Sequence, residues 1–379
     1  MGNTVGRNSL KGLPMSDFLQ KYKQTDTVLG KGGFGEVKLA LDSQGNEYAV
    51  KIIEKSVLAS NNEKISELYN EVSIIKNLDH QNIVKYHDFY EDKKTVRIVM
   101  GAGKADLFEH LCRTEKHTEN DCKRIIRKVT EALNHCHENG VVHRDIKPEN
   151  ILVGSAKNFE DVALIDFGLA KAVDIDIEAD DAEFEAKGRS RKTTVDTSLL
   201  RTKCGTLSYV APEVIRRNSY TYKCDIWSLG IVAYIVVSGG YHPFASSNTK
   251  QTRENVERGL WKFGPDKVWE KVSEEAKDFI RCCLNRDPSK RYTYNQLLQH
   301  EWIANPMIFE DRVHRDSRDP ISINVKLIQQ QLRADLIKGH LTSSEENLSI
   351  NQPILEIGRP IGTQVTFFDK NGRAALLED

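Results

Sequence analysis

One pattern of polar residues is suited to chemistry on phosphate, and its members are Asp145, Lys147, Asn150 and Asp166. The first three share a short segment that precedes an apolar pair, and the fourth follows the next apolar run. Carboxylate and amide oxygens are the ligands that hard ions such as Mg²⁺ prefer. A further carboxylate can orient an attacking hydroxyl, and a lysine can steady the transferring group. The pattern therefore indicates phosphoryl transfer from a metal-bound nucleotide.

A glycine-rich segment earlier in the chain fits the spacing G-x-G-x-x-G-x-V, with fixed positions at Gly30, Gly32, Gly35 and Val37. Glycine lets a backbone approach phosphate oxygens with no side chain in the way. Alone the signal is weak, because an ordinary hairpin turn can be just as rich in glycine. The neighbouring apolar residues alternate as in a strand, which favours a phosphate-covering hairpin over the strand-to-helix turn that binds dinucleotides.

Together these segments resemble the motifs of eukaryotic protein kinases. HRDIKPEN at residues 143–150, followed by DFG at 166–168, is similar to the catalytic loop and the metal-binding motif of that family. CGTLSYVAPE at 204–213 is similar to the end of its activation segment, with Leu207 in place of a common proline. The resemblance covers residues 25–303 and is closest to the calcium/calmodulin-dependent and calcium-dependent kinases. It implies an α+β fold of two lobes: a β-rich small lobe with one main helix, and a large helical lobe.

The resemblance implies a role for each polar residue of the first pattern. Asp145 would orient the substrate hydroxyl, and Lys147 would steady the transferring phosphoryl group. Asn150 and Asp166 would bind Mg²⁺, with ATP as the donor. Lys147 at this place is the serine/threonine form, so Ser and Thr hydroxyls of proteins are the expected acceptors. The alternative is a pseudokinase scaffold that binds nucleotide with little turnover; it is the weaker reading, because no polar catalytic residue is replaced.

Two charged residues of the expected small lobe acquire functions through the resemblance. Lys51, in a strand-like run over residues 47–53, would contact the α- and β-phosphates of ATP. Glu71, on a helix predicted over 63–78, would pair with Lys51 and hold it there. Either residue could instead be an ordinary solvated one. The residues expected around ATP are Leu29, Gly30, Lys31, Gly32, Gly33, Phe34, Gly35, Val37, Ala49, Lys51, Glu71, Met100, Asp106 and Leu152.

The connector between the expected lobes departs from the family. After Met100 it reads Gly101-Ala102-Gly103, where relatives usually have a bulkier pair and one more residue. Backbone groups hold adenine at this hinge, so small side chains leave binding possible while making the hinge more flexible. Asp106 would lie near the ribose and near basic residues of a peptide substrate; a helix-starting acid is an equally good explanation.

Structural roles are expected for three residues of the large lobe. Asp225 would bond to the backbone near His143 and Arg144. Arg291 would be the buried partner of Glu213, a pair that is costly to break. A long helix predicted over residues 118–140 would lead into the catalytic loop.

The activation segment contains an unusual insertion, residues 174–200, in which an acidic half is followed by a basic half. Blocks of like charge favour a solvated, disordered insertion, and a regulatory flap is the alternative. Thr202 is the candidate phosphorylation site for an upstream kinase, because a phosphate there could pair with Arg144 and Lys171. The plain alternative is an exposed loop residue.

Both ends of the chain are expected to lie outside the two lobes, which would span residues 25–100 and 104–303. Residues 1–24 are predicted to form a flexible arm. Gly2 half matches an N-acylation signal, with Gly6 where a hydroxyl is usual, so membrane association is expected only if Gly2 is acylated.

Residues 304–379 would form a regulatory or docking tail. In the kinases that the chain resembles, an amphipathic helix here blocks the substrate cleft or binds a calcium sensor such as calmodulin. A helix packed on the large lobe is the alternative, and the apolar stripe behind both readings is Val325, Ile328, Leu332 and Leu336.

Composition narrows the remaining possibilities. The net charge of −1 argues against nucleic acid as the main partner. No apolar run reaches the length of a membrane span, and no secretory leader is visible. The seven cysteines include no C-x-x-C pair, which indicates neither disulfides nor zinc. We therefore expect a cytoplasmic protein.

Overall fold

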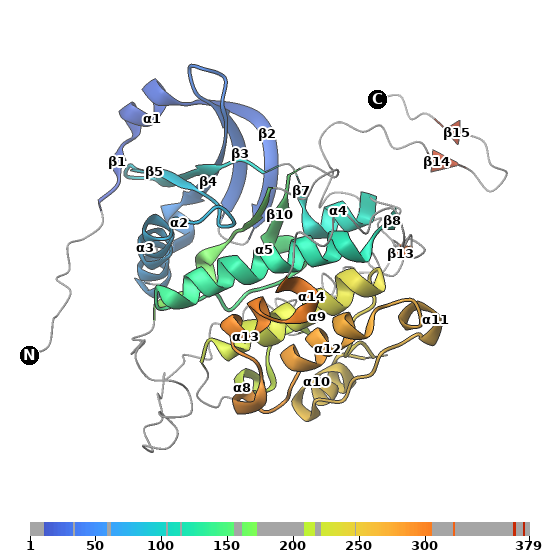
Figure 1. Cartoon of the computed structure of the whole chain (residues 1–379). Helices are drawn as coiled ribbons and strands as arrows, with labels where there is room; N and C mark the ends of the chain where they lie inside the picture. The colour runs from blue at the N-terminus through green and yellow to red at the C-terminus, as the bar shows by residue number, and fades with distance from the viewer. Residues whose placement is uncertain are drawn as a thin grey trace, which may run out of the picture.

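Figure 1 shows the computed structural model, in which a small lobe built on a sheet adjoins a large helical lobe. It describes residues 11–32, 35–58, 62–103, 105–113, 116–154, 161–172, 208–216, 221–246, 248–304, 321–322, 367–368 and 374–375. The predicted α+β, two-lobe fold is confirmed.

A six-stranded sheet forms the small lobe, in the order β1-β5-β6-β4-β3-β2. β1 runs parallel to β5, and the other neighbouring pairs are antiparallel. The strand predicted over residues 47–53 is present in this sheet as β4. Its strands are β1 (Leu13–Pro14), β2 (Lys23–Gly32), β3 (Gly35–Leu41), β4 (Glu47–Glu54), β5 (Tyr86–Glu91) and β6 (Thr95–Gly101).

Each face of this sheet buries its own apolar cluster, because successive side chains of a strand point to opposite faces. On one face, Ile53 and Ile98 pack with Leu68 and Val72 of helix α3 (Asn62–Asn77), which follows the short α2 (Lys55–Leu58). The other face buries Val50, Val99 and two aromatic residues from the start of the chain.

Those two residues, Phe18 and Tyr22, are 1% and 3% exposed. Phe18 lies on helix α1 (Met15–Lys21), and Tyr22 caps its end. Their rings pack edge-on against Tyr90 and Tyr48. The prediction of a flexible arm over residues 1–24 therefore does not hold for residues 13–24. The far face of the sheet needs an apolar cover, and this segment provides it.

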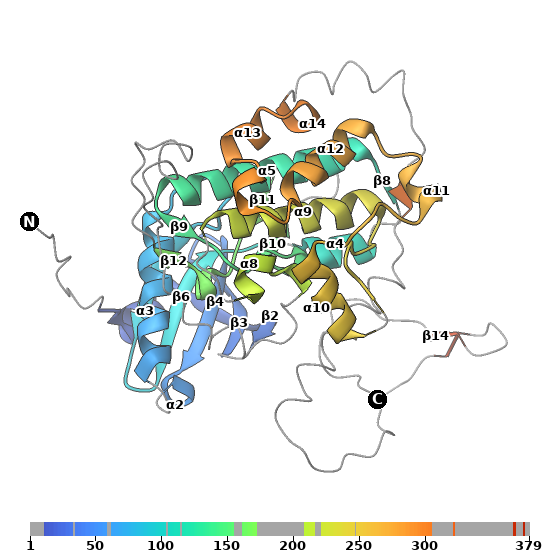
Figure 2. The same cartoon turned by 90° about the horizontal axis from the view of Figure 1, so that it is seen from below.

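The large lobe is built around α9 (Lys223–Ser238), in which every residue is buried. α5 (Glu119–Glu138) lies beside it in both views (Figures 1 and 2), as expected for a helix over 118–140. Thr118 and Asp121 form a capping box that starts α5. The other helices are α4 (Leu107–Arg113), α8 (Pro212–Ile215), α10 (Thr249–Arg258), α11 (Asp266–Trp269), α12 (Glu274–Cys283), α13 (Tyr294–Leu298) and α14 (Glu301–Ala304).

The predicted buried ion pair joins two distant parts of this lobe. Arg291 Nη1 and Nη2 donate to the carboxylate of Glu213 at 2.8 and 3.2 Å. The Arg291 side chain is fully buried and also lies over the ring of Trp227. Arg291 follows the 3-10 turn η4 (Pro288–Lys290), so the pair ties that turn to α8.

Short strands flank the two predicted catalytic segments. β7 (Ala105–Asp106), β10 (Ile151–Val153) and β11 (Val162–Leu164) form a small sheet, and β9 (Val141–Val142) pairs with β12 (Lys171–Ala172). β10 is preceded by the 3-10 turn η1 (Pro148–Asn150), and η2 (Phe167–Leu169) follows β11. These pairings bring both predicted catalytic segments to one place.

Little of the C-terminal tail is described. β13 (Ile321–Ser322) pairs with β8 (Lys116–His117), and β14 (Phe367–Phe368) pairs with β15 (Ala374–Ala375). The expected tail helix, the insertion at 174–200, Gly2 and Thr202 lie outside the described residues. Within the described ranges, no helix is both long and apolar enough to cross a membrane.

Candidate active site

The catalytic loop between β9 and η1 is held by Asp225 of α9. Its carboxylate accepts from the backbone N–H of His143 and of Arg144, each at 2.7 Å, as predicted. Arg144 has a φ of 71°, a left-handed conformation that is uncommon outside glycine. Burial raises the pKa of Asp225, while His143 and the two N–H groups oppose that rise. The two bonds therefore fix a strained turn directly before Asp145.

Asp145 is 2% exposed and lies at the centre of a polar cluster. Its Oδ2 accepts from Lys147 Nζ and from Asn150 Nδ2, both at 2.9 Å. Its Oδ1 is buried and has no hydrogen-bond partner among the described residues. Burial alone would lower the pKa of Lys147, but Asp145 raises it above its ordinary value, so the lysine is charged.

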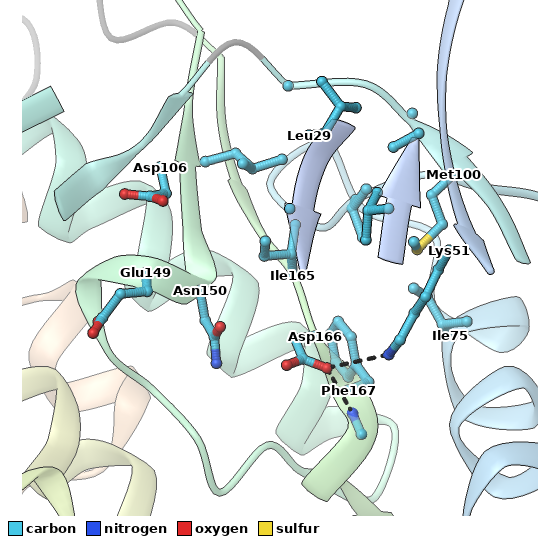
Figure 3. Close-up of a pocket in the computed structure, with 18 of the residues that line it drawn as sticks. Leu29, Lys51, Ile75, Met100, Asp106, Glu149, Asn150, Ile165, Asp166 and Phe167 are labelled. Atoms are coloured by element: carbon cyan, nitrogen blue, oxygen red, sulfur yellow. Dashed lines mark hydrogen bonds and ion pairs between the residues drawn. The ribbon is translucent and has the colours of Figure 1, made fainter. Parts of the chain in front are cut away.

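Asp166 follows β11 with a φ of 59°. Its Oδ1 accepts from Gly168 N at 3.4 Å and lies 3.5 Å from Lys51 Nζ, as the dashed lines of Figure 3 show. The next residue, Phe167, is buried, and its ring lies 4.8 Å from that of His143. Asp166 and Phe167 both line the pocket.

The residues present fit a hard divalent cation. The amide nitrogen of Asn150 donates to Asp145, at both its carboxylate and its backbone carbonyl. Its amide oxygen accepts no hydrogen bond from the described residues. Asn150 and Asp166 both line the same pocket (Figure 3), so an amide oxygen and a carboxylate are offered together. Oxygen donors of this kind suit Mg²⁺ better than softer metals.

Lys51 of β4 and Glu71 of α3 form the predicted ion pair, with Nζ to Oε1 at 2.6 Å. Burial alone would lower the pKa of Lys51, but Glu71 and Asp166 together raise it above its ordinary value. The ammonium is therefore charged and points into the pocket between two carboxylates. That position suits contact with a polyphosphate.

These groups surround a cavity of about 400 Å³ between the lobes. In Figure 3 the apolar residues Leu29, Met100 and Ile165 lie towards the top of the cavity, and Asp166 lies at its lower end with the Lys51 ammonium beside it. Such a division suits a flat aromatic base joined to a charged tail. The apolar lining includes Leu29, Val37, Ala49, Met100, Leu152 and Ile165.

The hinge is closely fitted to the floor of this cavity. β6 ends at Gly101, whose N–H donates to Lys85 O at 2.9 Å. A Cβ built on Gly103 would lie 2.4 Å from Leu152 Cδ1, far inside contact distance. The absence of a side chain at Gly103 thus lets the shortened connector lie directly over Leu152.

Comparisons with known proteins agree with this geometry. Residues 23–303 match the family described as Protein kinase domain. The chain belongs to the protein kinase family. Calcium/calmodulin-dependent protein kinase type 1 of Caenorhabditis briggsae is 34% identical over 305 residues, which covers 80% of this chain and 78% of that protein. The proteins of the same name in Caenorhabditis elegans and Macrobrachium nipponense are also 34% identical, covering 79% and 81% of their own lengths.

This kinase is accordingly an ATP-dependent serine/threonine kinase of the calcium/calmodulin-dependent kinase group, and its substrates are proteins. The predicted pocket residues that line the cavity are Leu29, Gly30, Lys31, Gly35, Val37, Ala49, Lys51, Glu71, Met100, Asp106, Asn150, Leu152 and Asp166. Asp145 is joined to this lining by its hydrogen bond from Asn150, and Lys147 donates to the same Asp145 oxygen. Gly33, Phe34 and Thr202 lie outside the described residues.

Several lining residues were missed by the sequence analysis. These are the apolar residues Ile53, Leu68, Ile75 and Val84 and the acidic residue Glu109. Leu68 and Ile75 are seven positions apart on the predicted 63–78 helix, so their apolar side chains share one face and are expected to point inward. Nothing in the sequence distinguishes Glu109 from an ordinary helix-surface acid.

Proposed function

We propose that this kinase transfers the γ-phosphate of Mg²⁺-bound ATP to Ser and Thr hydroxyls, with Asp145 as the residue that orients the attacking hydroxyl. The observation that carries the proposal is the Asp145 cluster. One carboxylate oxygen is held by Lys147 and Asn150, while the other is buried with no described partner. A hydroxyl that donates to Oδ1 would be held close to Lys147, the cation that steadies the group being transferred.

The other residues of the site divide the remaining tasks. Asn150 and Asp166 would hold Mg²⁺, which supplies charge neutralisation at the phosphates when it is bound. Lys51 would bind the α- and β-phosphates, because its ammonium is fixed by Glu71. Because an ordinary carboxylate is a weak base, Asp145 would act mainly by positioning and accept the proton late in the transfer.

Transfer of radiolabel from γ-labelled ATP to a serine peptide tests this proposal. We expect labelling by the wild-type kinase that requires Mg²⁺ and falls to background in Asp166→Asn. The same peptide with alanine at the acceptor position is the control for specific transfer. Equal labelling by wild type and Asp166→Asn would contradict the proposed metal site. No labelling by either would favour the pseudokinase scaffold.

The acidic side of the pocket supports a preference for basic residues upstream of the target hydroxyl. Asp106 and Glu149 lie on the same side of the cavity (Figure 3). Glu149 Oε2 is buried with no partner among the described residues, and burial raises the pKa of Glu149. A guanidinium would supply the missing partner. Asp106 Oδ1 also accepts from Glu109 N at 2.7 Å, so Asp106 caps α4 as well.

Peptides with arginine or alanine upstream of the serine test that preference. We expect kcat/KM to be higher for the arginine peptides, and Glu149→Gln to reduce the difference. A difference that Glu149→Gln leaves unchanged would contradict the assignment.

Regulation is proposed at two levels. Phosphorylation of Thr202 by an upstream kinase would create an anion that Arg144 and Lys171 could bind. Lys171 of β12 pairs with Val142 of β9, two residues before Arg144. Control by calcium-calmodulin acting on the tail is supported by the names of the Caenorhabditis relatives. Assays of wild type and Thr202→Ala, each with and without calcium-calmodulin, test both. Wild-type rates in every case would contradict both levels.

We propose the cytoplasm as the compartment, because the scattered cysteines suit a reducing environment. Membrane association would require acylation of Gly2. Intact mass after expression with an acyltransferase tests that modification, and an unmodified Gly2 would exclude it.

A further inference from the structure

Three consecutive residues of α3 contact three different parts of the kinase. Tyr69 Oη donates to Glu91 Oε1 at 2.7 Å, at the end of β5. Asn70 Nδ2 donates to the carbonyl of Ala170 at 3.3 Å, just after η2. Glu71 accepts from Lys51. Successive residues of a helix point about 100° apart, so these three contacts together fix the rotation of α3 about its axis.

Glu91 receives donors from three separate segments. Besides Tyr69, its Oε1 accepts from Lys55 Nζ at 2.6 Å, at the start of α2. Its Oε2 accepts from the backbone N–H of Gly12 at 3.3 Å. The Glu91 side chain is 19% exposed. Burial opposes ionisation, but Lys55 and Tyr69 lower the pKa of Glu91, so the carboxylate is charged. Burial and Glu91 together raise the pKa of Tyr69 to about 12.

The N-terminal segment closes the outer side of this cluster. A Cβ on Gly12 would lie 2.5 Å from Glu91 Cβ, so only glycine allows this approach without a shift. β1 pairs in register with the end of β5, with Pro14 opposite Glu91. Lys21 Nζ and Tyr22 Oη both donate to Asp88 of the same strand, at 2.7 and 2.5 Å. Residues 12–22 thus hold the strand end that carries Glu91.

We propose that Glu91 is a positioning residue for phosphoryl transfer, which acts through Tyr69 to set the rotation of α3 and keep Glu71 against Lys51. Residues 12–22 serve this function by fixing Glu91. The inference rests on the kinase activity, and it adds to the proposed roles a residue that touches neither nucleotide nor substrate. Glu91 lies on the same sheet as Lys51, so one rigid element carries both anchors of α3.

Glu91→Gln and Tyr69→Phe test the proposal, because each removes part of the linkage while keeping the size of the side chain. We expect kcat to fall at least about fivefold in each variant, since even sub-ångström displacement of a reacting group is costly. KM for the peptide should stay constant, because the peptide side of the pocket is untouched. Leu19→Ala is the control: Leu19 lies on α1 but is 71% exposed, and wild-type kinetics are expected.

Combination with Glu71→Gln separates positioning from simple stability. If Glu91 acts through Glu71, adding Glu91→Gln to Glu71→Gln should cause little further loss of kcat. The same fold-loss in both backgrounds would overturn the proposal. So would a Glu91→Gln variant that unfolds more easily but turns over at the wild-type rate once folded.

A second measurement does not depend on activity. Native-state hydrogen exchange of the amides of α3 should become at least about tenfold faster in Glu91→Gln, while the amides of α5 stay as in wild type. Unchanged exchange in α3 would overturn the proposal for Glu91. This result would hold whether or not the proposed catalytic roles are correct.

Discussion

The two lobes hold their functional groups in different ways. In the large lobe, Asp145 follows a turn that two backbone N–H groups tie to the buried carboxylate of Asp225, on a helix buried along its whole length. In the small lobe, Lys51 depends on Glu71, and the Lys51 side chain is 18% exposed. Glu71 lies on a helix that is tied to its surroundings by polar contacts from several segments.

This difference indicates that the large lobe holds its functional groups rigidly, whereas the small lobe can adjust the position of Lys51. Buried bonds to a central helix cannot be exchanged for water without large cost, whereas partly exposed ion pairs can. Changes in the large-lobe anchors should therefore unfold the protein, and changes in the small-lobe anchors should mainly alter turnover.

The largest effect is expected in the large lobe, for Glu213→Gln. The substitution leaves the fully buried Arg291 without its charged partner, which typically costs about 3–5 kcal/mol. Equilibrium denaturation of the wild type and the variant measures the change. A loss below about 1 kcal/mol would show that this pair does not anchor the lobe.

Phe18→Ala should produce the next largest loss, of about 3 kcal/mol, because it leaves a cavity beside Tyr90 and under Arg97. Leu19→Ala, next to it on α1, is the matched control and should change stability by less than about 0.5 kcal/mol. Equal effects of the two substitutions would mean that α1 does not belong to the folded core.

Glu71→Gln should separate turnover from stability. We expect kcat to fall at least about tenfold, or roughly 1.4 kcal/mol, because Lys51 loses its charged partner. The denaturation midpoint should fall less than in Glu213→Gln, because Lys51 keeps the Asp166 carboxylate as a second partner. Steady-state kinetics and denaturation of the same preparation decide. A fall in stability with unchanged kcat would reverse the proposed contrast.

The last effect concerns pH, and within one pH unit it is no larger than that of Glu71→Gln. Burial lowers the pKa of His242 in the large lobe to about 4, from an ordinary value of 6.5. The unfolded chain therefore binds a proton between these values while the folded protein does not. His242 should leave the free energy of unfolding unchanged above pH 6.5. Between pH 6.5 and pH 4 it should lower that free energy by at most about 1.4 kcal/mol per pH unit. Denaturation at several pH values should show a shallower fall in His242→Gln; an identical slope would contradict the assignment.

The parts that sequence could predict are those whose information is local. Asp145, Asn150 and Asp166 stand in short motifs with fixed spacing, and Lys51 and Glu71 lie on elements with clear periodicity. Glu91 was missed because it looks like an ordinary acid at the end of a strand. Its importance comes from Gly12, Lys55 and Tyr69, and their convergence depends on the fold.

The first residues of the chain illustrate the same limit. Residues 1–24 taken together are polar and mixed, so composition favoured a flexible arm. Phe18 and Tyr22 become buried only because β4, β5 and β6 present an apolar face that the rest of the small lobe leaves uncovered. The close fit of Gly103 to Leu152 likewise follows from the path of the hinge and has no signature in the sequence.

The most direct measurement of the central claim is the rate of phosphate transfer to a serine peptide by wild type and Asp145→Asn. The substitution keeps the shape of the side chain but removes the charge that orients the hydroxyl and accepts its proton. We predict a fall in kcat of at least about 100-fold, with KM for ATP nearly unchanged. Transfer at the wild-type rate by Asp145→Asn would contradict the account.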